Sequence, residues 1–262
     1  MRKLILIAAL AACTFAMGPA FAAGSAPKFE SQSWSFNGPF GHYDRGALKR
    51  GYQVYSEICA GCHSLKLVAY RNLTEIGFTE EEVKEIAAEA EIPAEPNEEG
   101  ATHDDDGERL MRPAKPSDRI AKPFLNEYEA RASNNGALPP DLSLMVKARK
   151  GGPDYLYALL TGYRDEPPEG FEMVNDDMAY NDVFPGHQIA MTQPLDDESV
   201  EYEDGTPMTL DQHSRDVVVF LAWAASPELE ARKRLGIKVM IFLLLLTGML
   251  YALKRRIWAR VH

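Results

Sequence analysis

The sequence predicts a mostly α-helical, loop-rich domain that is exported and held by a single C-terminal transmembrane helix. Three observations predict this class. Apolar residues recur at helical spacing with almost no strand-like alternation. Stretches rich in Pro, Gly, Asp and Glu separate these segments, and a long apolar segment lies near each end of the chain. Of the 262 residues, 45% are hydrophobic, which is enough for a packed core and excludes wholesale disorder.

The composition excludes two further classes of protein. The formal net charge of −11 argues against a nucleic-acid-binding protein, which would carry a basic surface. Three cysteines are too few for a disulfide-stapled scaffold. The charge is also unevenly distributed, because residues 24–231 contain all 39 acidic residues and residues 232–262 contain none. The sequence therefore predicts an acidic body with a basic, apolar tail.

Residues 1–22 are predicted to be a secretory signal peptide. Two basic residues precede the apolar run Leu4–Ala16, and Ala20-Phe21-Ala22 has the A-x-A pattern of a cleavage site. An N-terminal membrane helix is disfavoured because the apolar run is short and ends at Gly18-Pro19. Cys13 lies in a stretch that resembles a lipoprotein processing box, so its lipidation stays open as an alternative.

The apolar segment at about 235–253 is predicted to be the membrane anchor. Its length of about 19 residues spans roughly 30 Å at ~1.5 Å per residue, which matches the hydrocarbon core. Lys238 is its only charge, and basic residues flank both of its ends. A buried core helix is the weaker alternative. Since the signal peptide directs the body outward, the chain divides into the signal peptide 1–22, a periplasmic domain 23–226, and a C-terminal helix 227–262 with a short cytoplasmic tail.

The first half of the domain contains two predicted helices. Residues 44–58 have helical apolar spacing, with Asp44 as the N-cap. A second helix begins at Thr79, where Thr-Glu-Glu-Glu forms a capping box, and ends before Pro93. Residues 93–118 are rich in Pro, Gly and acidic residues and are predicted to be a loop or an insertion.

The second half contains three more predicted helices. Asn126 opens a short helix that Gly136 stops, and Pro153 opens another that ends at Gly162. Residues 164–208 are predicted to be loops with short strands at best. A longer helix follows at 209–225, and the last helix begins after Ser226-Pro227-Glu228 and continues into the membrane.

Cys59-Ala60-Gly61-Cys62-His63 has the C-x-x-C-H pattern that attaches c-type haem in exported proteins. The two thiols form thioethers with the haem vinyl groups, and the adjacent histidine ligates the iron. Three alternatives are weaker. A structural zinc site needs about four ligands, and the mature chain has no further cysteine. A redox-active dithiol is usually found in a βαβ context, and a plain disulfide does not require His63.

A mono-haem electron carrier needs a sixth iron ligand, for which Met and His are the usual residues. Met191 is attractive because it lies in a rigid stretch between Phe184 and Pro194, just before the helix at 209–225. His187 is the rival within the same stretch. The alternative for each is ordinary: a methionine often fills a core, and a loop histidine is often solvated.

Several segments match one known family over nearly the whole mature chain. They are Val54–Ser64, Val68–Arg71, Ala132–Ser143, Asp154-Tyr155, Leu160–Tyr163, Phe184–Gly186, Asp204–Pro207 and Phe220–Ala225 running into the basic flank of the anchor. Together they resemble the cytochrome c1 family, the membrane-anchored c-type cytochrome subunit of the cytochrome bc1 complex (ubiquinol–cytochrome c reductase). The resemblance implies a c-type cytochrome domain with one covalently attached haem c.

The resemblance also implies roles for particular residues. Cys59 and Cys62 would carry the haem, and His63 and Met191 would ligate its iron. Arg149 matches an arginine that pairs with a haem propionate, although a surface arginine is the alternative. The remaining haem-pocket positions match Asn134, Pro139, Pro140, Tyr155, Leu159, Leu160, Phe184 and Ile189.

Electron transfer is the function that the resemblance implies. The chain would take an electron from a Rieske iron–sulfur protein and pass it to a soluble or tethered cytochrome c, beside a cytochrome b subunit in a dimeric complex. The A-x-A signal, which has no features of an organelle transit peptide, places this complex in a bacterial inner membrane. The chain would transform no substrate on its own. Two alternatives are a free-standing tethered cytochrome shuttle and a haem sensor or haem enzyme with an open sixth site.

The acidic residues suggest how an acceptor is recruited. They cluster at Glu80–Glu82, at Glu95–Glu108 and at Asp196–Asp204. Their summed field would attract a basic cytochrome c and raise the association rate. The alternative is that these are solvated loops that keep the domain soluble.

Overall fold

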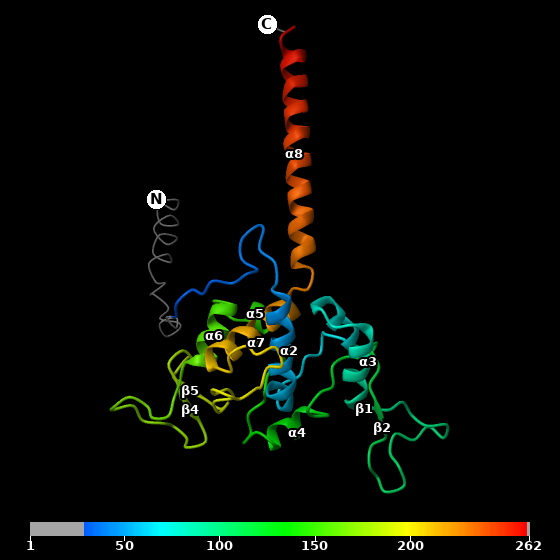
Figure 1. The fold of residues 1–262 in the computed structure, drawn as a ribbon, viewed down its shortest axis with the longest axis vertical. Helices are drawn as coiled ribbons and strands as arrows, with labels where there is room; N and C mark the ends of the chain where they lie inside the picture. Colours follow the sequence, from blue (N-terminus) through cyan, green and yellow to red (C-terminus); the bar gives the residue numbers. More distant parts are fainter. Residues whose placement is uncertain (1–28, 261–262) are drawn as a thin grey trace, which may run out of the picture.

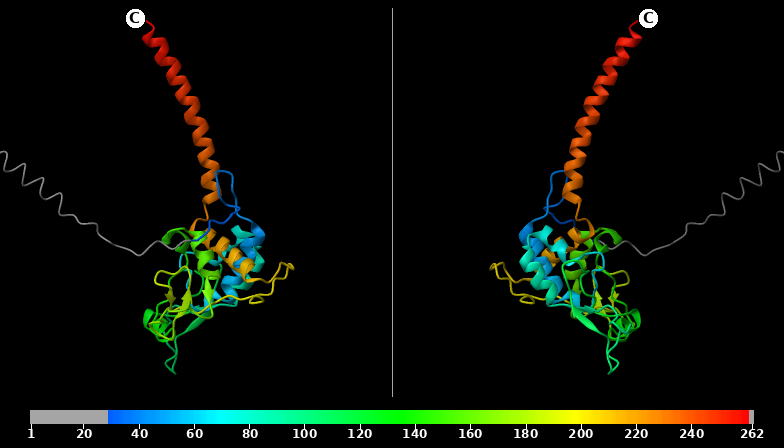
Figure 2. Two further views of the ribbon diagram at one scale, coloured as in Figure 1. Left: turned by 90° about the vertical axis from the view of Figure 1, so that its left-hand side faces the viewer. Right: turned by 90° about the vertical axis from the view of Figure 1, so that its right-hand side faces the viewer.

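The computed structural model describes residues 29–260, so the predicted signal peptide and Cys13 lie outside the described residues. A helical domain carries one long helix, α8 (Leu229–Trp258), which leaves the domain and projects alone (Figures 1 and 2). The other helices are α2 Arg45–Glu57, η1 Cys59–Gly61, η2 Tyr70–Ile76, α3 Glu80–Ala88, α4 Glu127–Ala132, α5 Met145–Ala148, α6 Pro153–Thr161 and α7 Leu210–Ala225. The mostly helical, loop-rich fold is confirmed.

Helix α7 is the centre of the domain. Every residue from Asp216 to Ala225 is buried, and α2, α5 and α6 all contact this helix. A helix that is apolar on all sides belongs in a core, and the run of Val, Phe, Leu, Ala and Trp in α7 has that character. Because α2 leads directly into Cys59 and α6 carries several predicted haem-pocket residues, this packing positions the candidate site.

A glycine permits the crossing of α2 and α7. A Cβ on Gly51 would lie 2.0 Å from the Asp216 carbonyl oxygen, so no larger residue fits there. At the preceding residue, Arg50 Nε donates to Asp216 Oδ2 at 2.8 Å. The Asp216 side chain is only 2% exposed, and its charge is compensated by this guanidinium. Close backbone approach and a shielded ion pair thus fix the two helices.

The helix starts follow the local sequence signals, whereas α4 ends at Ala132, four residues before the Gly136 that was expected to stop it. Asp44 accepts from Ala47 N at 3.1 Å, and Asn126 Oδ1 accepts from Tyr128 N and Glu129 N at 3.0 Å each. Thr79 forms the predicted capping box with Glu82. Each of these side chains satisfies backbone N–H groups that a helix leaves unpaired at its first turn.

Short strands occupy the loops. β1 (Glu91–Pro93) pairs antiparallel with β2 (Met111–Pro113), with Ile92 opposite Arg112. β3 (Tyr163–Arg164), β4 (Ala179–Asn181) and β5 (Gln188–Ile189) form a second antiparallel sheet in that order. The expectation of short strands within 164–208 is confirmed, whereas the pair β1–β2, η2 and α5 were not expected from the sequence.

Among the described residues, α8 is the one helix long and apolar enough to cross a membrane. It contains the whole predicted anchor at about 235–253, and none of its residues is buried against the domain. An exposed apolar helix of this length needs a lipid surrounding. The single C-terminal membrane helix is therefore confirmed.

Candidate functional site

The two cysteines lie in one tight turn directly after α2. The 3₁₀ turn η1 is closed by the Cys59 carbonyl oxygen, which accepts from Cys62 N at 3.1 Å and from His63 N at 2.8 Å. Cys59 packs against the core, Cys62 is exposed, and both thiols are free. One compact turn thus presents two sulfur atoms and an imidazole.

His63 is oriented by contacts on its ring and on its backbone. Its Nδ1 lies 2.8 Å from the Pro140 carbonyl oxygen, and its own carbonyl oxygen accepts from Tyr55 Oη at 3.1 Å. Since a carbonyl oxygen is only an acceptor, Nδ1 must carry the proton, which leaves the Nε2 lone pair for a metal. A backbone carbonyl on the far nitrogen is a frequent way to orient a histidine ligand.

The segment after Pro140 is bound to the segment after His63. Asp141 Oδ2 accepts from Ser64 Oγ and from Lys66 N at 2.8 Å each. Leu142 N donates to the Ser64 carbonyl oxygen at 2.9 Å. Burial would raise the pKa of the Asp141 carboxyl, but the hydrogen bonds from Lys66, Ser143 and Ser64 outweigh burial and lower it. The carboxylate therefore stays charged and holds the two segments together.

Sequence reasoning missed Asp141 and Tyr55 as supports of this site. Their residue types carry no signal of their own, because a tyrosine in a helix and an aspartate beside a proline are both common. Both were inside segments that matched the family, but only the fold shows which backbone groups they bind.

Burial keeps the candidate ligands in neutral forms. It lowers the pKa of His63, although the hydrogen bond to Pro140 acts in the opposite direction. Burial, with a smaller contribution from Cys62, raises the pKa of the Cys59 thiol to about 12. A neutral imidazole is the form that binds a metal.

A second group of predicted residues gathers around α6. Tyr155 is buried, while Leu159 and Leu160 are half-buried against the core. Asn181, which is fully buried, joins the end of α6 to the next loop: its Nδ2 donates to the Leu159 carbonyl oxygen at 2.8 Å, and its Oδ1 accepts from Phe184 N at 3.0 Å. The sequence analysis did not identify Asn181.

Met191 lies at the edge of this second group. Tyr163 Oη donates to the Met191 carbonyl oxygen at 3.1 Å. This bond attaches the backbone around Met191, here called the methionine segment, to β3, the strand that follows α6. Ile189, two residues earlier, is buried in β5. The backbone at Met191 is thus held by a tyrosine that the sequence analysis did not single out as a site residue.

His187, the rival sixth ligand, is engaged elsewhere. Its ring stacks on Tyr180 with centroids 5.7 Å apart and meets Phe171 edge-on. Its Nδ1 lies 3.1 Å from the Asn181 carbonyl oxygen. These contacts make His187 a support of the β4–β5 turn.

In the described part of the chain, three predicted haem-pocket residues make no side-chain hydrogen bond to the residues around His63 or around α6. Asn134 Nδ2 donates to the nearby Ala130 carbonyl oxygen at 2.7 Å, and Pro139 is half-buried. Arg149 is exposed. Its charge lies near enough to Tyr155 to oppose the rise in the pKa of that phenol, which burial causes.

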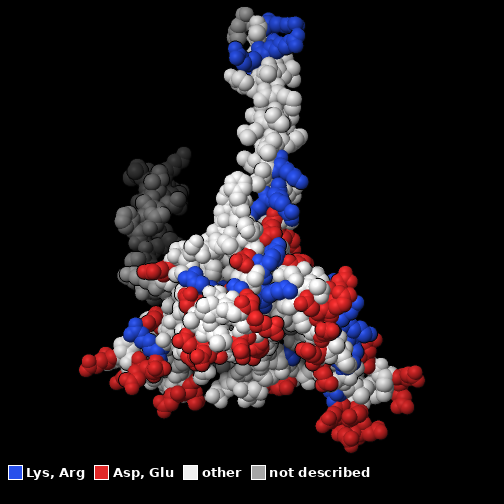
Figure 3. Space-filling model, viewed as in Figure 1, with Lys and Arg blue, Asp and Glu red and all other residues white. Residues whose placement is uncertain are grey.

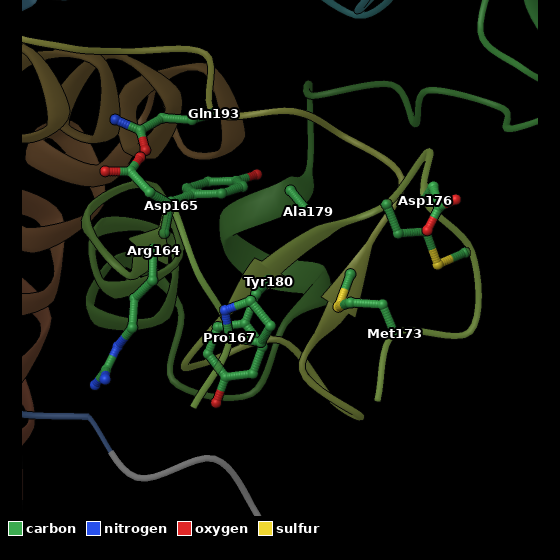
Figure 4. A pocket seen from close by; sticks show the side chains of 10 residues that line it. Arg164, Asp165, Pro167, Met173, Asp176, Ala179, Tyr180 and Gln193 are labelled. Carbon is green, nitrogen blue, oxygen red and sulfur yellow. The ribbon is translucent and has the colours of Figure 1, made fainter. Parts of the chain in front are cut away.

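A pocket of about 370 Å³ lies beside the methionine segment (Figure 4). Figure 4 shows Tyr180 and Pro167 at its middle, with Met173 and Asp176 contributed by the loop between β3 and β4. Tyr163 also lines it. None of the haem-pocket residues predicted from the sequence lines this pocket, so it is separate from the predicted haem contacts.

The residues present fit a c-type haem. The donor set is two free thiols in one turn, a neutral imidazole with an available Nε2, and partly buried aliphatic side chains on α6 that pack against the same core as Cys59. No group of three or more His, Cys, Asp or Glu side chains that could hold a metal ion occurs within residues 29–260. The fold and this site define a class: a helical, membrane-anchored electron-carrier domain.

Comparison with known proteins places the chain within that class. A model of the Cytochrome C1 family matches residues 34–261. "Cytochrome c1" of Rhodospirillum rubrum is 50% identical over 244 residues, covering 88% of this chain and 87% of that protein. The mitochondrial "Cytochrome c1, heme protein" of Saccharomyces cerevisiae is 50% identical over 229 residues, covering 87% and 72%. "Cytochrome b/c1" of Bradyrhizobium diazoefficiens is 45% identical over 250 residues, covering 87% of this chain and 35% of that protein. The chain belongs to the cytochrome c1 family.

Proposed function

We propose that this chain carries one haem c, bound through thioethers to Cys59 and Cys62, with His63 and Met191 as the axial ligands of its iron. As a member of its family the chain is a haem protein and the membrane-anchored electron-carrier subunit of the bc1 complex. The haem supplies a one-electron couple at its iron. The free thiols of the η1 turn and the oriented imidazole of His63 support the proposed attachment.

The protein's part is to hold the ligands and exclude water. Pro140 fixes the tautomer of His63, and Asp141 binds the backbone beside it. Tyr163 holds the Met191 segment through its carbonyl oxygen. The apolar side chains of Leu159, Leu160, Phe184 and Ile189 would line the haem together with Tyr155, Pro139 and Asn134, and Arg149 would pair with a propionate. An apolar surrounding and a methionine ligand both favour a high reduction potential.

The electron path follows from the place of this subunit in its complex. We assign a Rieske iron–sulfur protein as the donor and a basic cytochrome c as the acceptor, with a cytochrome b subunit beside α8 in a dimeric assembly. A relative whose name joins b and c1, matched over 35% of its length, supports the neighbouring cytochrome b. The acidic surface of the domain supports a basic acceptor.

In this proposal the chain belongs to a bacterial cell. Its domain lies in the periplasm and its C-terminus in the cytoplasm. The signal-like residues 1–22 support the side of the membrane, and the relative from Rhodospirillum rubrum supports a bacterial cell. The basic residues Lys254, Arg255 and Arg256 follow the apolar run directly and agree with a cytoplasmic tail.

The observation that carries the proposal is the pair of free thiols beside an oriented histidine, and covalent attachment is its direct test. Haem should stay with the polypeptide on a denaturing gel and after acid–acetone extraction. Replacing both Cys59 and Cys62 by alanine should abolish the retained haem, whereas Met178→Leu, a loop variant, should keep it. Complete extraction of haem from the unaltered chain would exclude haem c.

A further inference from the structure

A short uncharged loop stands beside the root of the membrane helix. Residues 36–41, Phe-Asn-Gly-Pro-Phe-Gly, rise next to the first turns of α8 (blue in Figure 1), and Figure 3 shows no charged atom at the upper end of this loop. None of the predicted haem contacts lies in this loop.

The loop is fixed to α8 rather than merely near it. Lys233 Nζ donates to the Phe36 carbonyl oxygen at 2.6 Å and to the Gly41 carbonyl oxygen at 3.0 Å, so one ammonium group closes both ends of the loop. Glu230 Oε1 accepts from Tyr43 N at 2.8 Å, and Glu230 also pairs with Arg45 at 2.9 Å. The height of the loop relative to α8 is therefore set by four polar contacts.

These contacts set the loop at the depth where the apolar run begins. Lys233 is two residues before Leu235, which is about 3 Å along a helix axis. Leu235 and Phe242 are each 61% exposed. A membrane that surrounds this run has its surface near Lys233, at the level of the loop.

The loop has a buried base and an exposed aromatic tip. Trp34 stacks on Phe36 with centroids 5.7 Å apart, and both rings are buried. Phe40, in contrast, is 81% exposed. An exposed phenylalanine on a braced loop, level with a membrane surface, can bury its apolar ring at the boundary between headgroups and acyl chains.

We propose that the loop 36–41 is a second membrane contact of this protein, with the Phe40 ring inserted among the lipid headgroups on the side from which α8 enters. The partner is the lipid surface itself. Two contacts, the helix and the loop, fix the tilt of the domain on the membrane. One helix alone would leave α8, and with it the braced domain, free to tilt in the bilayer.

A nitroxide spin label at position 40 tests this contact in the complete membrane complex, reconstituted in phosphatidylcholine–phosphatidylglycerol vesicles. Phe40→Cys carries the label, and Val174→Cys is the control, because Val174 is 84% exposed in the loop between β3 and β4 at the far end of the domain from α8 (Figure 1). Label collisions with oxygen, which enters lipid, are compared with collisions with a water-soluble nickel chelate. The retained haem of each variant serves as the folding control.

At position 40 oxygen should collide more often than the nickel chelate, and at position 174 the order should be reversed. A Lys233→Met background should release the loop and shift the position-40 label toward the behaviour of position 174. The proposal is overturned if the nickel chelate reaches position 40 as readily as position 174, or if the label is shielded from both reagents, which would place a protein partner there. Phe40→Trp gives an independent measurement. Brominated lipids should quench the fluorescence that the added tryptophan contributes, and an absence of this quenching would count against the proposal.

Discussion

His63 owes its orientation to a residue 77 positions away in the chain. The C-x-x-C-H pattern is local, because one short turn brings both thiols and the imidazole together. The second requirement, a fixed tautomer, is met by the Pro140 carbonyl oxygen, and Asp141 holds that segment in place. The identity of this iron ligand can therefore be predicted from the residues next to it in the sequence. Its orientation depends on a distant backbone group that the sequence spacing does not reveal.

At the residue scale, Met191→Leu tests the proposed sixth ligand. Leucine keeps the apolar volume but has no sulfur to bind iron, so covalent haem should remain while the near-infrared sulfur–iron band disappears and carbon monoxide binds the reduced protein. The reduction potential should fall by a sizeable part of the roughly 0.8 V that axial ligands span. Spectroscopy and a redox titration measure this. Met178→Leu is the matched control and should change none of these, and a surviving band in Met191→Leu would assign the ligand to another residue.

The Asp118–Arg112 pair gives a residue-scale prediction on pH. The Arg112 guanidinium, followed by the Lys115 N–H, lowers the pKa of the Asp118 carboxyl from 3.8 to about 2. Because the folded-state pKa is depressed, the pair stabilises the fold above pH 3.8 and this contribution is lost as the pH falls toward 2.

Asp118→Asn should therefore lower the free energy of unfolding at neutral pH and flatten its decline between pH 3.8 and 2. Denaturant titrations at several pH values, followed by circular dichroism, measure both. Asp105→Asn, on the exposed tip of the β1–β2 hairpin, is the control and should leave the profile unchanged. Equal profiles for Asp118→Asn and the unaltered chain would show that the pair does not stabilise the fold.

At the scale of elements, the crossing of α2 and α7 decides where the haem motif lies. Cys59 follows α2 after one residue, so any shift of α2 moves the η1 turn. Gly51 lets the helices touch through their backbones, and the Arg50 guanidinium compensates the charge of the buried Asp216 carboxylate in that contact. The helix caps act locally and fix where α2 begins, whereas this contact fixes where it lies.

Gly51→Ala should separate the two helices. The added methyl group would lie 2.0 Å from the Asp216 carbonyl oxygen. Overpacking of this kind lowers the free energy of unfolding by up to about 3 kcal/mol. Gly46→Ala, in the same helix, would meet the Arg50 and Asp44 side chains at 3.3 Å, a much milder approach than that to a backbone oxygen, and should cost far less than Gly51→Ala. Thermal unfolding of both variants provides the comparison, and equal melting temperatures for the two would contradict the close contact.

At the scale of the whole molecule, charge is sorted along the long axis. Figure 3 shows acidic residues over the part of the domain remote from α8 and basic residues at both ends of that helix. Some acids of the sequence clusters have structural contacts: Glu82 completes a capping box, Asp204 pairs with Arg50, and Asp197 accepts from Leu210 N at 2.8 Å in the segment that loops out before α7 (Figure 2). These three acidic residues therefore do more than keep a solvated loop soluble.

Electron transfer to a basic cytochrome c should slow with rising ionic strength, on the order of tenfold, because salt screens the attraction between the partners. Neutralising Glu98, Glu99, Asp105 and Asp106 should flatten this dependence without changing the haem spectrum. These side chains make no hydrogen bond within residues 29–260. Stopped-flow kinetics in the second-order regime measure the rate constant.

The matched control removes four charges elsewhere, at Glu166, Glu169, Glu172 and Asp176 in the loop between β3 and β4. Comparison of the two variants tells which loop faces the incoming acceptor. A rate constant indifferent to salt in the unaltered chain would leave the acidic clusters as solubility devices.

Sequence by itself determined the helices other than η2 and α5, their N-terminal caps, the membrane anchor and the C-x-x-C-H turn. Each of these depends on residues within a few positions of one another, as Asp44 with Ala47 or Thr79 with Glu82 illustrate. Matching segments added Met191 and the pocket residues as expectations, on resemblance rather than on geometry.

Only the tertiary structure decided how these parts are held. Asn181 joins α6 to the loop at Phe184, Tyr163 binds the Met191 carbonyl oxygen, and Lys233 closes the loop 36–41 against α8. In each case a side chain meets a backbone group that is distant in sequence. Every residue except proline offers the same N–H and C=O, so no sequence pattern marks which one will be met, and the folded chain alone selects it.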